Sequence, residues 1–167
     1  MSWLPIIICL AALALILGPV MLMQPTPAQR REAELRKEAA SQGLRVHFQP
    51  IPEGSDFKSR TNHAVTYCLP WQHQADIKNQ WLLVRKRFAH DLHFSGKWDW
   101  VQKPKVSMEP DVEEALRGML QEIPDFVFAI SSGPQGLCGF WNELGKVEHV
   151  QAMGQWLKAS APQLSVQ

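Results

Sequence analysis

The stretch FVFAISSGPQGLCGFWNE (residues 126–143) decides the predicted fold. Two apolar runs flank the four residues from Gly133 to Gly136, whose glycines and proline are typical of a tight turn. The pattern predicts two antiparallel strands joined as a hairpin. Ser131 lacks the preceding glycine of a nucleophile elbow, and the turn lacks the Lys-Ser/Thr of a phosphate-binding loop. We therefore interpret the glycines as turn residues.

Helical patterns flank the hairpin on both sides. Before it, Asp111 and Glu114 open a segment that Pro124 ends, and apolar residues recur there at helical spacing. After it, Val147, Val150, Met153 and Leu157 indicate a last helix, in which Gly154 allows close backbone approach. The apolar positions of the first helix are Val112, Ala115, Leu116, Met119, Leu120 and Ile123.

Upstream of these elements, alternation of apolar and polar residues predicts four more strands. They cover residues 44–49, 65–69, 81–88 and 97–102. Because they follow one another along the chain, we expect an antiparallel meander. The sequence thus predicts an α+β domain of order αββββαββα after an N-terminal helix, with helices packed on one face of a mainly antiparallel sheet.

A helical stalk is predicted over residues 25–43. Thr26, Pro27 and Gln29 have the form of an N-cap, a proline at the first helical position and a capping-box residue. Gly43 is a candidate C-cap. Leu35 is the segment's one large apolar residue, so we expect a mostly solvated helix.

The chain begins with the uncharged run LPIIICLAALALILGPVMLM (Leu4 to Met23), which at 1.5 Å per residue would span about 30 Å. This length predicts a transmembrane anchor and hence a membrane partner. Basic residues follow the run and none precedes it, which predicts a single-pass protein of the bacterial inner (cytoplasmic) membrane. Its N-terminus would lie outside and its C-terminal domain in the cytoplasm. The basic residues are Arg30, Arg31, Arg36 and Lys37.

Four segments follow from these patterns: an anchor over 1–24, the stalk over 25–43, one cytoplasmic α+β domain over 44–160 and a flexible tail over 161–167. Cys9 lies in the anchor. Cys68 and Cys138 as reduced thiols suit a reducing compartment, although a single disulfide stays open.

The uncharged helix followed by QPTPAQRREAELRKEA resembles the anchor and basic linker of bacterial YajC-type translocase accessory proteins over residues 4–40. The whole chain is also similar to small single-pass inner-membrane proteins of unknown function from Gram-negative bacteria. The first resemblance implies an accessory protein, and the second implies no activity.

No catalytic, cofactor-binding or metal-binding residue is predicted. His90 and His93 could hold a metal with Cys68 or His73, but the ligand spacing is poor and we expect surface histidines. Cys138 with His149 could be a thiol nucleophile and its base, but a small buried strand residue is the stronger interpretation.

A basic and aromatic group supplies the candidate contact residues. Residues 56–105 carry nine Lys/Arg and four Asp/Glu, whereas 106–167 carry three and eight, so the halves differ in sign. The alternative is structural, because charge protects an exposed strand from edge pairing and tryptophans pack in cores. Nucleic acid is not expected, since the net charge of the whole chain is only +1. The candidates are Arg85, Arg87, Lys97, Lys103, Trp98 and Trp100.

Three functions stay open at this point. The leading hypothesis is a non-enzymatic interaction or accessory protein that binds another inner-membrane complex. Enzymatic activity is the less favoured interpretation. The second is a ligand-binding or enzymatic module that uses a pocket between the sheet and the 111–123 helix. The third is a basic face that senses anionic lipid.

Overall fold

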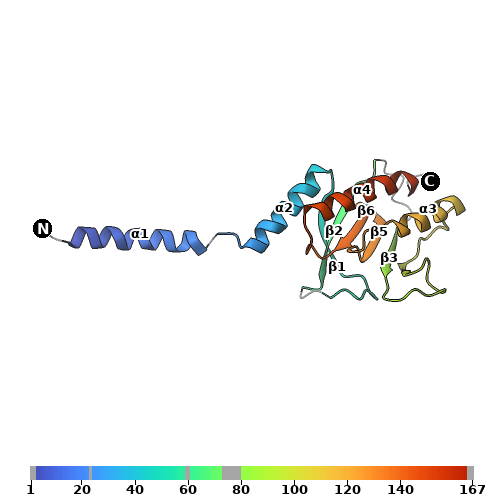
Figure 1. Cartoon of the computed structure of the whole chain (residues 1–167), viewed down its shortest axis with the longest axis horizontal. Helices are drawn as coiled ribbons and strands as arrows, with labels where there is room; N and C mark the ends of the chain where they lie inside the picture. Colours follow the sequence, from blue (N-terminus) through green and yellow to red (C-terminus); the bar gives the residue numbers. More distant parts are fainter. Residues whose placement is uncertain (1–2, 23, 59–60, 73–79, 165–167) are drawn as a thin grey trace. The chain divides into compact units, whose positions relative to one another are not determined.

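The computed structural model describes residues 3–22, 24–58, 61–72 and 80–164, and Figure 1 shows the whole chain. Its elements follow the order α1 (Leu4–Leu22), α2 (Pro27–Ser41), β1 (Arg45–Pro50), β2 (His63–Leu69), β3 (Trp81–Arg85), β4 (Trp98–Gln102), α3 (Pro110–Gln121), β5 (Ala129–Gly133), β6 (Gly136–Trp141) and α4 (Val147–Leu164). This confirms the order αββββαββα after the first helix. The chain divides into two compact units, Met1–Ala33 and Glu34–Gln167.

The first unit corrects the transmembrane prediction. Helix α1 forms at the expected residues. Among the residues that the structure describes, however, no helix has both the length and the apolar character needed to cross a membrane. The single-pass anchor and the inner-membrane localisation built on it are therefore wrong.

Helix α2 begins and ends as its caps predict. The Thr26 amide donates to Gln29 Oε1 at 2.9 Å, and the Gln29 amide donates to Thr26 Oγ1 at 3.3 Å. These reciprocal bonds satisfy amides that the first turn leaves unpaired. At the other end Gly43 has φ +77°, and the Leu44 amide donates to the Ala39 carbonyl at 2.9 Å. A left-handed glycine therefore closes the helix as expected.

The six strands that the described residues form belong to one sheet in the order β1-β2-β6-β5-β3-β4, and every neighbouring pair is antiparallel. The predicted hairpin is confirmed as β5–β6. The predicted meander is wrong, because that hairpin inserts between β2 and β3. The insertion is favourable because β6 is buried at every residue, which suits a central strand better than an edge.

The main core lies between this sheet and the helices. Helices α3 and α4 lie on the same side of the sheet (Figure 1), and the second half of α2 contributes Leu35 and Ala39 to the same core. This confirms the prediction of helices on one face. Leu116 from α3, Leu157 from α4 and Trp141 from β6 are all fully buried in it. Their burial removes large apolar areas from water and supplies most of the driving force for folding.

The opposite face of the sheet carries a smaller cluster and a disulfide. Ala64, Val84, Ala129 and Phe140 form the cluster. Cys68 and Cys138 face each other across β2 and β6 and are bonded, with their Cα atoms 4.0 Å apart. The expectation of reduced thiols is thus corrected. Pairing brings together two cysteines that lie 70 residues apart in the sequence.

Candidate functional site

Three of the six predicted contact residues line one recess. Arg85 ends β3, Lys97 closes the loop that follows, and Trp98 begins β4, where it pairs with Arg85 across the two strands. Leu120 and Gln121, at the end of α3, complete the wall, and the space measures about 290 Å³. We call this space, lined mainly by Arg85, Ser95, Lys97, Trp98, Leu120 and Gln121, the basic recess. It lies at the end of α3, beside the β3–β4 connection, while the space between the sheet and the rest of α3 is filled by the core.

Arg85 is held in place from two sides. Its guanidinium lies 5.5 Å from the centroid of the Trp98 ring, which is a favourable cation–π arrangement. It also donates to the Asp125 backbone carbonyl at 2.7 Å and to Asp125 Oδ1 at 2.9 Å. The Asp125 side chain is 99% exposed, so water competes strongly for this ion pair.

The other three predicted residues lie elsewhere. Trp100 faces the core, where its ring contacts Trp81 at 6.0 Å and Phe94 at 4.6 Å between centroids. Arg87 is exposed in the loop after β3. Lys103 is exposed just beyond the end of β4, and antiparallel pairing with β3 puts that end away from Arg85. The structure therefore groups Arg85, Lys97 and Trp98 without Lys103.

The loop that borders the basic recess, residues 86–97, displays two large apolar side chains. Phe88 is 78% exposed and Leu92 is 86% exposed. Phe94 instead packs inward against Trp100, and the Arg117 guanidinium lies over its ring at 4.3 Å. We call this segment the β3–β4 loop. Its inner side is built into the domain, while its outer side leaves apolar surface in water.

The histidines of the β3–β4 loop contribute to its turn. The Leu92 amide donates to His90 Nδ1 at 3.1 Å, and His93 Nδ1 lies 3.1 Å from the Gly96 carbonyl oxygen. Within the described ranges no three His, Cys, Asp or Glu side chains gather as metal ligands. Cys68 is consumed by the disulfide, and His73 lies outside the described residues.

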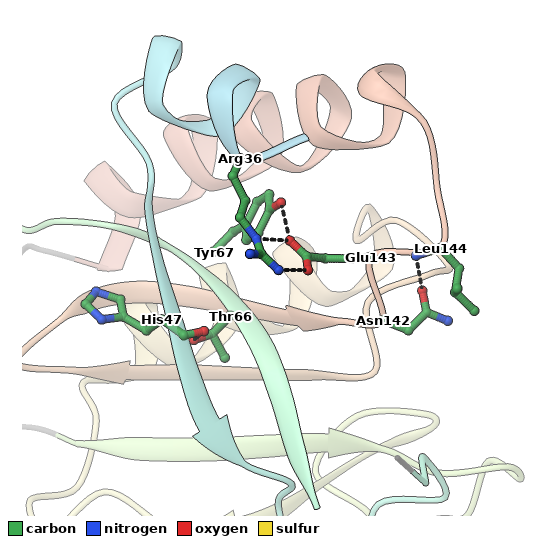
Figure 2. A network of polar contacts seen from close by, with 7 residues as sticks. All are labelled: Arg36, His47, Thr66, Tyr67, Asn142, Glu143 and Leu144. Atoms are coloured by element: carbon green, nitrogen blue, oxygen red, sulfur yellow. Dashed lines mark hydrogen bonds and ion pairs between the residues drawn. The ribbon is translucent and has the colours of Figure 1, made fainter. Parts of the chain in front are cut away.

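A second polar cluster is buried beneath α2 (Figure 2). Glu143 accepts hydrogen bonds from Arg36 Nε at 3.1 Å and from the Tyr67 hydroxyl at 2.9 Å, both at Oε1. Its other oxygen accepts from the terminal nitrogen of Arg36 at 2.7 Å. The fork-to-fork geometry and the phenol satisfy the carboxylate. We call Arg36 and Glu143 the buried pair after its carboxylate, which is 6% exposed, whereas the Arg36 side chain is 35% exposed; the pair joins α2 to the turn after β6.

The backbone around the buried pair is unusual. Glu143 has φ +52°, a left-handed conformation that costs a residue with a side chain some energy. The Leu144 amide donates to Asn142 Oδ1 at 3.0 Å and so supports the turn. On β1 and β2, Thr66 Oγ1 donates to the His47 carbonyl at 3.1 Å, as Figure 2 shows. The strained turn holds the Glu143 carboxylate under α2.

Cys138 and His149 do not form a nucleophile and base. The Cys138 sulfur is bonded to Cys68, and His149 Nδ1 accepts from the Lys146 amide at 3.1 Å at the start of α4. The His149 ring also meets the Phe126 ring edge at 4.9 Å. Both side chains therefore serve the fold, as the structural interpretation predicted.

The sequence pattern does not disclose the buried pair. Arg36 and Glu143 are 107 residues apart, and Arg36 lies next to Lys37 and Glu38 in a segment whose composition suggests solvent exposure. The one available signal is Leu35, an isolated large apolar residue that marks the side of α2 facing the domain. Tyr67, the only tyrosine in the chain, adds a hydroxyl to an otherwise apolar strand face.

The chain matches no protein-family model, no curated protein and no solved structure. The resemblance of residues 4–40 to YajC-type proteins therefore stays a prediction. Any functional inference must come from the recess, the loop and the buried pair.

Proposed function

We propose that this chain is a non-enzymatic interaction module that binds a partner protein through the β3–β4 loop and the basic recess beside it. The observation that carries the proposal is the exposure of Phe88 and Leu92 on one structured loop. Fully burying such side chains is worth roughly 1.5 to 3 kcal/mol each. A partner that covers them would gain this energy.

The loop is organised before a partner arrives. The His90 amide donates to the Gly96 carbonyl at 3.3 Å, and Ser95 and Trp98 exchange backbone hydrogen bonds at 3.1 and 2.8 Å. The Lys86 amide also donates to the Lys97 carbonyl at 2.7 Å. Because these bonds limit the loop's freedom, less conformational entropy is lost on binding. Apolar side chains on such a framework are typical of interface anchors.

Charge around the loop favours an acidic partner. Arg87 and Lys97 are both exposed, and neither forms an ion pair in the described part of the chain. Arg85 adds a third positive charge at the base of the loop. Cations at the edge of an apolar contact mainly raise the association rate and select against basic partners.

Site-specific photo-crosslinking in cells of the native host tests the proposal. A photoreactive residue replaces Leu92, and the matched control carries it at Gln155, an exposed position on α4. We expect a defined adduct with one protein from position 92 and none from 155. For the double variant Phe88→Asp/Leu92→Asp, the photoreactive residue is placed at position 97 instead, because position 92 is now aspartate. The double variant should give at least tenfold less of the same adduct than the chain that keeps Phe88 and Leu92, a loss of roughly 1.4 kcal/mol or more. Equal adducts from both positions would contradict the proposal.

Anionic lipid is the competing occupant of this surface. The purified domain is mixed with vesicles of phosphatidylglycerol, and sedimentation is compared with vesicles of phosphatidylcholine. The proposal expects no difference between the two. The wild type could sediment with the anionic vesicles while Phe88→Asp/Leu92→Asp does not. This result would show that the surface binds lipid, and it would overturn the proposal.

A further inference from the structure

We infer that the basic recess is a binding site for a carboxylate that carries an apolar group. This inference deepens the proposed interaction function, since it names the chemical group that the recess would take from a partner. Arg85, Lys97 and Ser95 supply two cations and one hydroxyl, above a narrow apolar floor of Trp98 and Leu120, which are 3% and 5% exposed. The combination suits a ligand with one charged end and one apolar body.

The positive wall is positioned by the fold. Arg85 projects from the end of β3 toward α3, and the Trp98 ring beneath it limits its rotation. Its two hydrogen bonds to Asp125 use only two of the five N–H donors that a guanidinium has. The remaining donors can receive a carboxylate in the planar geometry that arginine favours.

A ligand can displace the Asp125 carboxylate from Arg85. One of its two bonds comes through the backbone carbonyl, which stays in place when the carboxylate turns away. The carboxylate itself is almost fully solvated, so little energy is lost when a ligand takes over its single bond. An incoming carboxylate can therefore exchange with Asp125 without disturbing the position of Arg85.

The size of the recess limits the ligand. Its volume of about 290 Å³ lies at the small end of ligand pockets, which commonly hold 300 to 1,000 Å³. One residue of a polypeptide, such as an aromatic or aliphatic C-terminal residue, would fill it. A free small acid of the same chemistry is the other possible source.

Titration of the full chain with 3-phenylpropionate, followed by NMR of the backbone amides of residues 95–98, tests the inference. The neutral probe 3-phenylpropionamide has the same shape without the charge. We expect the acid to bind at least about tenfold more tightly than the amide, because charged hydrogen bonds are strong. Equal binding of the two probes would overturn the inference.

Substitutions at the recess separate its two positive charges. Arg85→Gln should weaken binding of the acid about tenfold or more, and Lys97→Gln about threefold. Lys103→Gln removes the same charge beyond the other end of β4 and should change nothing. Should Arg85→Gln fail to fold, Arg85→Lys keeps the charge and loses the fork, and it should still bind several-fold more weakly. Unchanged affinity in both Arg85 variants would refute the site.

Asp125→Asn gives a test with the opposite sign. Removing the competing carboxylate should tighten binding of 3-phenylpropionate by about two- to fivefold. Weaker binding would show that Asp125 helps to hold the ligand and would contradict the exchange.

A third probe distinguishes the two possible sources of the carboxylate, a polypeptide C-terminus and a free small acid. Acetyl-Gly-Gly-Phe with a free C-terminus is compared with the free acid and with its own amidated form. Tighter binding of the free peptide assigns the site to a polypeptide, and tighter binding of the free acid assigns it to a small molecule; both support carboxylate recognition. If the recess binds no carboxylate but position 92 still crosslinks to a partner, only this inference is rejected. If the recess binds the carboxylate but position 92 gives no adduct, only the proposed function is rejected.

Discussion

The buried pair and the Arg85–Asp125 pair have similar contact distances, although the Glu143 carboxylate accepts from two nitrogens of Arg36 and the Asp125 carboxylate from one nitrogen of Arg85. In each, an arginine terminal nitrogen lies 2.7 or 2.9 Å from a carboxylate oxygen, and the guanidinium lies 5.2 or 5.5 Å from an aromatic ring centroid. They differ in the carboxylate: Glu143 is 6% exposed and Asp125 is 99% exposed. Distance alone therefore does not tell a structural ion pair from a replaceable one.

Burial decides between the two roles. Removing Arg36 would leave the Glu143 carboxylate, which is 6% exposed, with little water in its place, and this is destabilising; the Arg36 side chain itself is 35% exposed. An exposed pair loses little, because water takes the place of the missing partner. The buried pair therefore belongs to the fold and secures α2, whereas Arg85 is available for a ligand. The comparison makes three predictions about stability, from the largest to the smallest.

The disulfide should have the largest effect. Cys68 follows Tyr67 on β2, so the bond supports the strand that completes the buried pair. The double substitution Cys68→Ala with Cys138→Ala should lower the free energy of unfolding by about 4 kcal/mol, because it frees a long loop in the unfolded chain. Urea unfolding measures this, with thiol titration of the wild type as a check. The native, unreduced protein should show one free thiol, that of Cys9, and three free thiols would contradict the bond.

The central test compares the two carboxylates directly. Glu143→Gln should lower the free energy of unfolding by about 1 to 2 kcal/mol, since it weakens the bonds from Arg36, whose side chain is 35% exposed and keeps contact with water. Asp125→Asn is the matched control and should cost less than about 0.5 kcal/mol. Urea unfolding of both variants measures the difference. Equal losses would show that burial does not separate the two pairs.

The smallest effect concerns Glu38, a partly exposed carboxylate on α2. Side-chain hydrogen bonds from Gln42, and then from Gln151 on α4, lower the pKa of Glu38 below its ordinary value. A lowered pKa in the folded state means that the stabilisation is present above the ordinary pKa and is lost as the pH falls through the folded value. The wild type should therefore lose its small advantage over Glu38→Gln in acid.

NMR titration of the Glu38 carboxyl measures this shift. Gln42→Ala combined with Gln151→Ala removes both amide donors and should move the pKa of Glu38 back toward its ordinary value. An unchanged titration in that variant would assign the shift to another cause. The result shows whether hydrogen bonds from neutral amides are enough for a partly exposed carboxylate to contribute to stability.

Local patterns predicted the local features of this protein. The capping residues Thr26 and Gln29 and the turn at Gly133 to Gly136 act within a few residues of each other, so the sequence contains their cause. The apolar period of α3 works in the same way. Of the candidate site, the composition marked Arg85, Lys97 and Trp98 but not their grouping. The transmembrane prediction used the length of an uncharged run and its flanking charges, and the finding that no described helix could cross a membrane overturned it.

The sequence by itself determined the order of helices and strands, because periodicity, caps and turns depend on neighbouring residues. Only the tertiary structure decided which strands became neighbours, which cysteines bonded and which carboxylate was buried. Those outcomes depend on contacts between residues as distant as Arg36 and Glu143, for which the linear pattern carries no signal. The contrast between the buried pair and the basic recess arises at that level, since exposure to water is a property of the packed chain.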